Sequence, residues 1–479
     1  MALNRWAVLF WGICISFILL IFIPEDQDVI RSLSVTMIAV TCLGYYLYER
    51  YSKKLTIQAD LIICLNTLLQ FLIPVFFLVP YYSSKPELDI WSHRYGFAIT
   101  SFAAFLGQTM FFWGYESIRP GLFFPSVKDT MNKVKMTRFI RVIVFLGGVV
   151  WVSRIILLQT GTYYHLNTSD FQFTSPYFSV LTQLSNYGNL VVGALFLLAF
   201  SETNNYQRSR KMKLAIVMFI LEIGYFLPSG SRTTLIFTFL FPIIAYILVM
   251  NRIPVKTIIL SLLLGAPIFF ILGEYRYITA EFTSASVVDF KRLPDSFNST
   301  LERTETVELV DKSYIVVNRM YDGMNLNHLL SHYSNDYDYE FGKTYINVIY
   351  IFIPRFIFTS KPVFTMALGG WYTLVSSGST PITFWGESYI NFSWFGIIIC
   401  SFLLGIFIKY FDYLFVKMAD KPFWCFVYLY CAIKIFLLPM EAFVIWMSYL
   451  TKFILIAFLL TLLYSHVSAK QKGLLNSKN

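Results

Sequence analysis

Long runs of apolar residues recur along this chain, separated by shorter polar stretches. A run of about 20 apolar residues is the length that an α-helix needs to cross a hydrocarbon core roughly 30 Å thick. The runs are continuous, whereas the strands of a membrane β-barrel alternate apolar and polar positions. The pattern therefore predicts an all-α polytopic membrane protein, with residues 1–479 forming a single membrane domain.

We expect about twelve transmembrane helices, and prolines inside them, such as Pro74, are expected as tolerated kinks. The expected spans are Trp6–Pro24, Val29–Tyr48, Leu55–Pro80, Arg94–Tyr115, Phe139–Leu158, Tyr177–Phe200, Leu214–Leu227, Thr233–Met250, Thr257–Leu272, Ser388–Tyr410, Phe423–Met440 and Ile445–Tyr464. Hydrophobic residues make up 57% of the chain and charged residues 14%, which agrees with this class. The six cysteines fall inside expected spans, so no disulfide framework or cysteine metal site is indicated.

Basic residues concentrate in every second loop between the expected spans. Examples are Lys53 and Lys54, Lys133 and Lys135, and Lys417 and Lys421. Because lysine and arginine are enriched in cytoplasmic loops, this alternation predicts that both termini are cytoplasmic. The first apolar run has no small-residue cleavage site, so we expect it to be retained as a span. Much of the net charge of +10 is accounted for by this bias, and nothing indicates a nucleic-acid partner.

The apolar runs give way to a long polar segment at residues 273–387, which the same rule places on the outer side of the membrane. Apolar positions at helical spacing return between Ser313 and Tyr333, and a short apolar stretch broken by Pro354 is interpreted as re-entrant or interfacial. Arginines gather in and near this segment: Arg232, Arg276, Arg292, Arg303, Arg319 and Arg355. Since a guanidinium binds phosphate in a bidentate manner and stays protonated, the cluster indicates an anionic ligand, and we expect a lipid pyrophosphate.

Several short motifs follow one another in the second half of the chain. They are Ser229–Arg232, Glu274–Arg276, Arg319–Asp322, Ile353–Arg355, Ser360–Pro362, Gly386–Phe392 and Lys409–Tyr413. Their order and spacing, over about Leu214 to Tyr413, resemble the bacterial oligosaccharide repeat-unit polymerases of the Wzy type, which include the O-antigen and enterobacterial common antigen polymerases. The first six spans match that family only in hydropathy.

The resemblance implies a GT-C-like membrane architecture and a glycosyltransferase of the bacterial plasma membrane. Such a polymerase transfers a glycan from undecaprenyl pyrophosphate to a new lipid-linked repeat unit at the outer face of that membrane. Its partners would be these lipid-linked donors and acceptors, membrane lipid and a chain-length regulator. Charge develops on the leaving pyrophosphate, so catalysis requires preorganised cations. The expected pyrophosphate ligands are Arg232, Arg276, Arg319, Arg355 and Lys361, with no cofactor and no metal.

The acceptor hydroxyl must also lose a proton. Glu387, at the start of a span, is the first candidate base, because partial burial would raise the pKa of its carboxyl. His328 and His332, four residues apart, are rival bases. Each candidate has a structural alternative: Glu387 would suit a helix N-terminus, Arg319 an ion pair with Asp322, and interfacial arginines simple anchoring. The acidic residues Asp336, Asp338 and Glu340 are interpreted as a solvated tip rather than as a metal site.

Two other functions fit the same features. An O-antigen ligase shares the architecture and the donor, and differs in transferring the glycan to a lipid A core. A flippase or other transporter of lipid-linked oligosaccharides would require polar residues through the middle of the membrane and a repeat in two halves. The charges gather at one face, which favours chemistry at that surface.

Overall fold

The computed structural model describes residues 4–24, 27–52, 58–84, 96–118, 133–159, 176–226, 232–250, 254, 256, 317, 321–336, 338–352, 382–418, 428–431, 434–435, 437–439, 442–443, 445–448 and 450–451. Within these ranges every secondary-structure element is a helix, which confirms the predicted all-α class for this part of the chain. The chain divides into two compact units. Unit 1 comprises residues 1–123, 313–417 and 434–455, and unit 2 comprises residues 124–312, 418–433 and 456–479.

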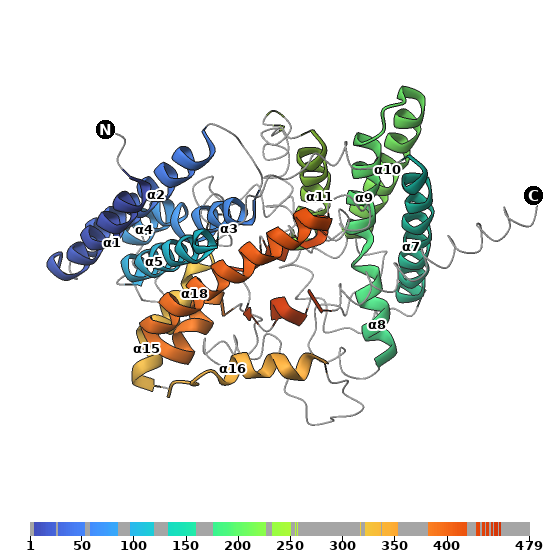
Figure 1. Ribbon diagram of the computed structural model, residues 1–479. Helices are drawn as coiled ribbons and strands as arrows, with labels where there is room; N and C mark the ends of the chain where they lie inside the picture. Colours follow the sequence, from blue (N-terminus) through green and yellow to red (C-terminus); the bar gives the residue numbers. More distant parts are fainter. Residues whose placement is uncertain are drawn as a thin grey trace, which may run out of the picture. The chain divides into compact units, whose positions relative to one another are not determined.

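Unit 1 combines the N-terminal helices with the outward segment and the long helix that follows it (Figure 1). Its elements are α1 (Arg5–Phe22), α2 (Asp28–Tyr51), α3 (Ala59–Thr67), the π-helical turn η2 (Leu68–Leu72), α4 (Val75–Ser84), α5 (Gly96–Ser117), α15 (Gly323–Asp336), α16 (Lys343–Ile346), the 3₁₀ turn η6 (Asn347–Phe352) and α18 (Phe384–Met418). Unit 2 contains α7 (Lys133–Gln159), α8 (Pro176–Ser185), α9 (Gly188–Phe200), α10 (Asn205–Phe226) and α11 (Arg232–Met250).

Six of the described helices are long and apolar enough to cross a membrane. They are Arg5–Phe22, Asp28–Tyr51, Ala59–Ser84, Gly96–Ser117, Ile140–Gln159 and Phe384–Tyr413, and Gly188–Phe200 and Leu235–Met250 are shorter apolar helices. The prediction of a polytopic membrane protein is thus supported for these six spans. The expected span Thr257–Leu272 lies outside the described residues.

The third span is interrupted in its middle by Pro74. The turn before it, η2, closes with the N–H of Ile73 bonding to the carbonyl of Leu68, a π-type bond of 2.8 Å. Proline has no N–H, so Pro74 cannot bond to the carbonyl of Gln70 four residues earlier. The helix therefore offers one backbone acceptor, Gln70 O, to a partner outside the helix.

Helix α18 begins at Phe384, four residues before the expected span start at Ser388, and is kinked inside. Phe392 (φ −145°, ψ 23°) and Ser393 (φ 56°, ψ −149°) leave helical geometry. The positive φ of Ser393 is a conformation that residues other than glycine adopt only under strain, at a cost of about 1–3 kcal/mol. The first two turns of α18 thus form a short helix of their own, which joins the long span at a strained corner.

A buried charged cluster ties five helices of unit 1 together at one end. We call it the Arg50 cluster; it comprises Arg5, Arg50, Asp60, Glu116, Lys409 and Asp412. Arg50 bonds to Glu116, and its Nε lies 2.9 Å from Asp60 Oδ2. Arg50 also donates to Gln58 Oε1 at 3.0 Å. Because an unpaired charge in hydrocarbon is costly, these pairs hold the ends of α1, α2, α3, α5 and α18 at one level.

The position of the Arg50 cluster agrees with the alternation of basic and basic-poor loops in unit 1. Arg50 ends α2, Asp60 begins α3 and Glu116 lies near the end of α5. The loops that follow Arg50, Glu116 and Lys409 are among the basic ones that the sequence assigns to a single side of the membrane. Asn391 lies 21 residues before Asp412 on α18, or about 30 Å at 1.5 Å per residue. The described outward segment, which contacts Asn391, therefore lies at the opposite end of unit 1.

Unit 2 is organised around a fully buried ion pair between α7 and α10. Arg154 donates to Glu222 with both terminal nitrogens, Nη1 to Oε2 at 2.7 Å and Nη2 to Oε1 at 2.5 Å. Its Nε and Nη2 also donate to the carbonyl of Ser185, the last residue of α8, at 3.2 and 2.8 Å. The expected sixth span is broken there into α8 and α9. Arg154 thus pairs a buried carboxylate and also satisfies a carbonyl at the helix break.

Close packing leaves no room beside this pair. A Cβ atom on Gly188, the first residue of α9, would lie 2.3 Å from Arg154 Nη2 and 2.5 Å from the Glu222 carboxylate. The ring of Tyr225 lies against the guanidinium, with its centroid 4.1 Å from Arg154 Cζ. Both charged side chains are therefore paired inside unit 2.

The first testable prediction is the membrane orientation of unit 1. In a cysteine-free background, Asp338→Cys should react with an impermeant maleimide on intact cells, because Asp338 is exposed on the outward segment. Lys417→Cys, beyond the Arg50 cluster, should react only after permeabilisation. Labelling of Lys417→Cys in intact cells would contradict this orientation.

The second prediction concerns the buried pair of unit 2. Arg154→Met should lower the free energy of unfolding by about 3–5 kcal/mol, because it leaves the Glu222 carboxylate buried without its partner. The double variant Arg154→Met with Glu222→Met should recover much of that loss. Thermal unfolding in nanodiscs measures both, and Arg141→Met, at an exposed arginine of the same helix, is the matched control. Equal stability of Arg154→Met and Arg141→Met would exclude a stabilising role for the pair.

Candidate functional site

The candidate site lies where the outward segment meets the first turns of α18. Thr383 precedes α18 with φ 63°, and its Oγ1 accepts the N–H of Gly386 at 3.0 Å, which caps the helix. The N–H of Phe384 donates to the carbonyl of Pro439 at 3.1 Å. These bonds fix the direction in which the motif Gly386–Phe392 enters the membrane domain.

Asn391 is the central polar residue of this entry. Its Oδ1 accepts the N–H of Gly342 at 2.9 Å, and its Nδ2 donates to Thr344 Oγ1 at 2.6 Å and to the carbonyl of Glu387 at 2.7 Å. The amide is completely buried. Gly342 has φ 86°, a left-handed conformation that glycine adopts without strain, and it turns the chain into α16. Asn391 therefore holds the outward segment to α18 with two hydrogen bonds, and a third bond ties its amide to the α18 backbone.

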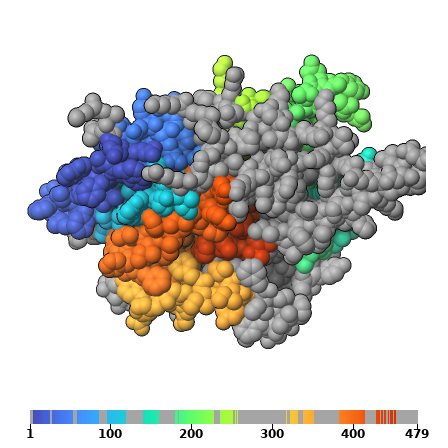
Figure 2. All heavy atoms as spheres, viewed as in Figure 1, coloured from blue at the N-terminus to red at the C-terminus, as the bar shows by residue number. Residues whose placement is uncertain are grey.

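A backbone bond adds to this attachment. Because the kink at Phe392 and Ser393 ends regular helical geometry, the carbonyl of Ile390 lies at a helix end, where carbonyls lack a partner in the next turn. It accepts the N–H of Glu340 at 2.9 Å. In Figure 2 the atoms of α15 and α16, in yellow-orange, adjoin those of α18, in orange, along one surface.

Glu387 lies inside this contact, with 1% of its surface exposed. Its Oε2 accepts the N–H of Phe443, and Thr344 hydrogen-bonds to the same carboxylate. Thr344 therefore links Glu387 to Asn391. In this arrangement Glu387 joins α18, α16 and the segment around Phe443. Its proposed role as a base stays a prediction.

The aromatic residues of the outward segment pack on the same helix. Tyr345 OH lies 2.9 Å from Ser388 Oγ, and the Tyr345 ring packs against Phe443 with centroids 5.9 Å apart. Burial raises the pKa of the Tyr345 phenol well above its usual value, so the hydroxyl stays neutral. The rings of Tyr339 and Tyr389 meet edge to face at 6.2 Å. These ring contacts add apolar packing to the hydrogen bonds at the α18 entry.

A second attachment point lies at the start of α15. The N–H of Asp322 donates to Gln70 O at 3.2 Å, the carbonyl that Pro74 leaves without a helical partner. Tyr321 is 4% exposed and packs among Val75, Leu78, Val79, Tyr82 and Phe97. Burial raises the pKa of Asp322 to about 7. Relative to the unfolded chain, this shift stabilises the fold fully below about pH 4, and the contribution is lost as the pH rises through about 7.

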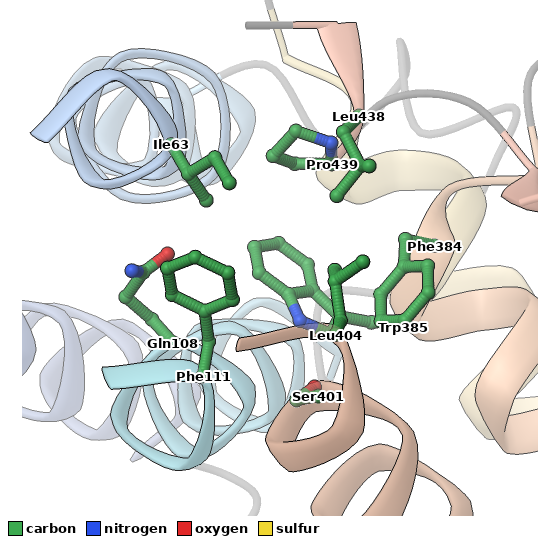
Figure 3. Close-up of a pocket in the computed structure, with 9 residues that line it drawn as sticks. All are labelled: Ile63, Gln108, Phe111, Phe384, Trp385, Ser401, Leu404, Leu438 and Pro439. Atoms are coloured by element: carbon green, nitrogen blue, oxygen red, sulfur yellow. The ribbon is translucent and has the colours of Figure 1, made fainter. Parts of the chain in front are cut away.

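A small pocket lies below the α18 entry, within the helices of unit 1 (Figure 3). It is lined by Ile63, Gln108, Phe111, Phe384, Trp385, Ser401, Leu404, Leu438 and Pro439. Gln108 Nε2 and Ser401 Oγ are buried there without a hydrogen-bond partner in the described part of the chain. Buried polar atoms of this kind are commonly satisfied by internal water.

The structure describes only some of the site residues that the sequence predicts. Glu387 lies at the α18 entry, and His328 lies on α15, partly buried. Arg232 begins α11 in unit 2, with its side chain outside the described set. Arg276, Arg319, Arg355 and Lys361 lie outside the described residues, as does the side chain of His332. Among the residues described, no group of three or more His, Cys, Asp or Glu side chains could hold a metal ion.

Some residues that shape the site carry signals that the sequence analysis did not use. Asn391 lies inside an apolar span, where a buried amide requires partners, and Gln70 lies four residues before Pro74. Away from the site, in the Arg50 cluster, Asp60 carried a signal that was not used, and Asp412 entered only as part of the motif Lys409–Tyr413. A polar residue within a span predicts that a partner exists but does not identify it.

Comparison with known protein families, curated proteins and solved structures finds no match for this chain. The functional argument consequently depends on the residues and on their contacts.

Proposed function

We propose that this protein is a Wzy-type polysaccharide polymerase. It transfers a glycan from undecaprenyl pyrophosphate to a new lipid-linked repeat unit at the outer face of a bacterial plasma membrane. The observation that carries the proposal is the attachment of the outward segment to the polymerase-like motif of α18. Asn391 of that motif bonds to Gly342 and Thr344 of the segment. The proposed protein has about twelve spans in a GT-C-like arrangement, with both termini in the cytoplasm.

The proposed chemistry is a displacement at the anomeric carbon of the donor sugar. The acceptor hydroxyl attacks this carbon, and undecaprenyl pyrophosphate leaves with the bonding electrons. The departing pyrophosphate gains charge, so cations that are already in position lower the barrier. Arg232, Arg276, Arg319, Arg355 and Lys361 supply these cations in the proposal, with Arg319 close in sequence to the fixed residue Asp322.

The attachment geometry supports a reaction at the membrane surface. Asn391 holds the start of α16 against the first turns of α18, near one end of that span. A segment attached in this way can present charged residues to a lipid headgroup with little reorganisation during reaction. A pyrophosphate linked to a polyprenyl chain carries its charge at that level of a bilayer.

A lipid-linked oligosaccharide transporter is the second candidate function. The observation that favours it is the broken helix α8–α9, with the buried Arg154–Glu222 pair beside the break. Transporters commonly place substrate sites at discontinuous helices. Both Arg154 and Glu222 are already paired with each other, however, and Arg154 also satisfies Ser185 O. The pair is therefore explained by its stabilisation of the helix break, without any role in transport.

The third prediction tests the arginine clamp. Arg319→Lys and Arg232→Lys should reach the membrane in normal amounts but lose polymerisation on the order of tenfold to a thousandfold, because lysine cannot bind two phosphate oxygens in one plane. Arg292→Lys, a conservative change in the same polar segment, is the matched control and should be nearly silent. Polymer length on a gel, with protein amount measured in the same membranes, gives the result. Polymer of wild-type length from both Arg319→Lys and Arg232→Lys would exclude the clamp.

The fourth prediction concerns metal ions. Polymerisation by purified protein should persist in EDTA, because arginines rather than a divalent cation neutralise the pyrophosphate in the proposed mechanism. The measurement is the rate of polymer formation before and after chelation. Complete loss of activity that magnesium or manganese restores would show that the mechanism needs a metal, and would direct attention to Asp338 and Glu340.

A further inference from the structure

Asp322 is fixed against a membrane helix by its backbone. Its N–H donates to the Gln70 carbonyl beside Pro74, and the preceding residue Tyr321 is packed among apolar side chains of α4 and α5. The Tyr321 and Phe97 rings lie 5.5 Å apart. The backbone of residue 322 is therefore held in a defined position, although the residue lies in the connection before α15.

One carboxyl oxygen of Asp322 lacks a hydrogen-bond donor within the described residues. Its Oδ2 is shielded from solvent and has no hydrogen-bond partner in the described part of the chain, and the same holds for Gln70 Oε1. A carboxylate oxygen and an amide oxygen can only accept hydrogen bonds. An unpaired buried acceptor of this kind points to a bound group that donates, such as a hydroxyl. Asp322 as a residue is partly buried, but Oδ2 itself is closed to solvent.

Among the residues that the structure describes, the elements packed around Asp322 bring no charged partner to it. Neither η2 nor α4 contains a charged residue, and the charged residue of α5, Glu116, lies at its far end in the Arg50 cluster. On α2, Arg31 donates to Leu20 O, and Asp28 accepts from Ser32. On α15 itself the nearest titratable side chain in sequence is His328. Burial alone raises the pKa of Asp322 to about 7, so both protonation states are populated at neutral pH.

We propose that Asp322 is the proton acceptor for the attacking hydroxyl of the acceptor glycan. This inference rests on the proposed polymerase function. As the hydroxyl oxygen forms its bond to the anomeric carbon, the bond from that carbon to the pyrophosphate oxygen breaks and the pyrophosphate keeps the electron pair. The hydroxyl proton passes to Asp322 Oδ2, which must lose it again before the next transfer.

Asp322 suits this role better than Glu387. The Glu387 carboxylate already accepts the N–H of Phe443 and hydrogen-bonds to Thr344, and 1% of the residue surface is exposed. A proton acceptor needs a free oxygen within hydrogen-bond reach of the substrate. Asp322 Oδ2 has no hydrogen-bond partner in the described part of the chain, whereas the Glu387 carboxylate is already bonded to two other chain segments.

The first arm of the test measures protonation without any reaction. Full-length protein in nanodiscs is treated with dicyclohexylcarbodiimide, which modifies protonated carboxyls in apolar surroundings, and each peptide is quantified by mass spectrometry. Modification of Asp322 should fall with rising pH, with a midpoint near the pKa of about 7. The exposed Asp338 should stay unmodified and serves as the control. Absence of modification at Asp322 at any pH would contradict a buried, titrating carboxyl.

The second arm measures the rate of polymerisation against pH. Asp322→Asn should lose on the order of a hundredfold to ten-thousandfold in rate, the usual contribution of a general base, while binding of the lipid-linked donor is kept. Asp322→Glu should retain part of the rate and shift the acidic limb of the pH profile, which a purely structural role would not move. Asp338→Asn should resemble wild type.

The outcomes separate the two claims. Wild-type rates in Asp322→Asn would overturn the inference and leave the polymerase proposal standing. If Glu387→Gln removes the acidic limb of the pH–rate profile and Asp322→Asn does not, the proton acceptor is Glu387. That result would likewise overturn the inference. If wild-type protein makes no polymer from lipid-linked repeat units, the proposed function fails, and the role of Asp322 in it falls too.

Discussion

A polar group inside a bilayer must find its partner within the protein, and this constraint organises the described structure. Where a span is regular, the helix satisfies its own backbone. Pro74 and the kink at Ser393 each interrupt a span and leave one backbone carbonyl without a helical partner. In both places an N–H of the outward segment donates to that carbonyl: Asp322 to Gln70 and Glu340 to Ile390. The irregularities of the membrane helices are therefore the attachment points of the segment that we propose for catalysis.

The same constraint explains the buried charges. Arg154 pairs with Glu222 and reaches the carbonyl of Ser185 at a third interruption, between α8 and α9. The Arg50 cluster holds five helices of unit 1 at the end opposite the outward segment. Ser393, in contrast, is strained, at a cost of about 1–3 kcal/mol. Three hydrogen bonds of Asn391, each worth about 0.5–1.5 kcal/mol, can offset that strain.

The sequence predicted those features that depend on local pattern. Apolar runs gave the helical class and the approximate positions of the six long spans, and the helical spacing after Ser313 predicted a helix where α15 begins at Gly323. The pairing of Arg154 with Glu222 and of Glu116 with Arg5 and Arg50 agrees with the general rule that unpaired charges are excluded from spans. The kink at Ser393 and the start of α18 at Phe384 were not predicted. Both depend on partners, Gly342 and Pro439, that come from distant parts of the chain.

The candidate site shows the same limit. Glu387 was chosen for its position at a span start, but its burial against Phe443 is a tertiary contact that no local pattern reveals. Asp322 entered only as the partner of Arg319, since its contact with Gln70 joins residues more than 250 positions apart.

The central claim is that this chain joins lipid-linked glycans. Its most direct test is to incubate purified full-length protein in nanodiscs with undecaprenyl pyrophosphate-linked repeat units and to analyse the glycans by mass spectrometry. The account predicts a ladder of products that grow by one repeat unit, with one undecaprenyl pyrophosphate released for each new bond. Unchanged repeat units, moved across the bilayer of a proteoliposome without any longer glycan, would contradict it.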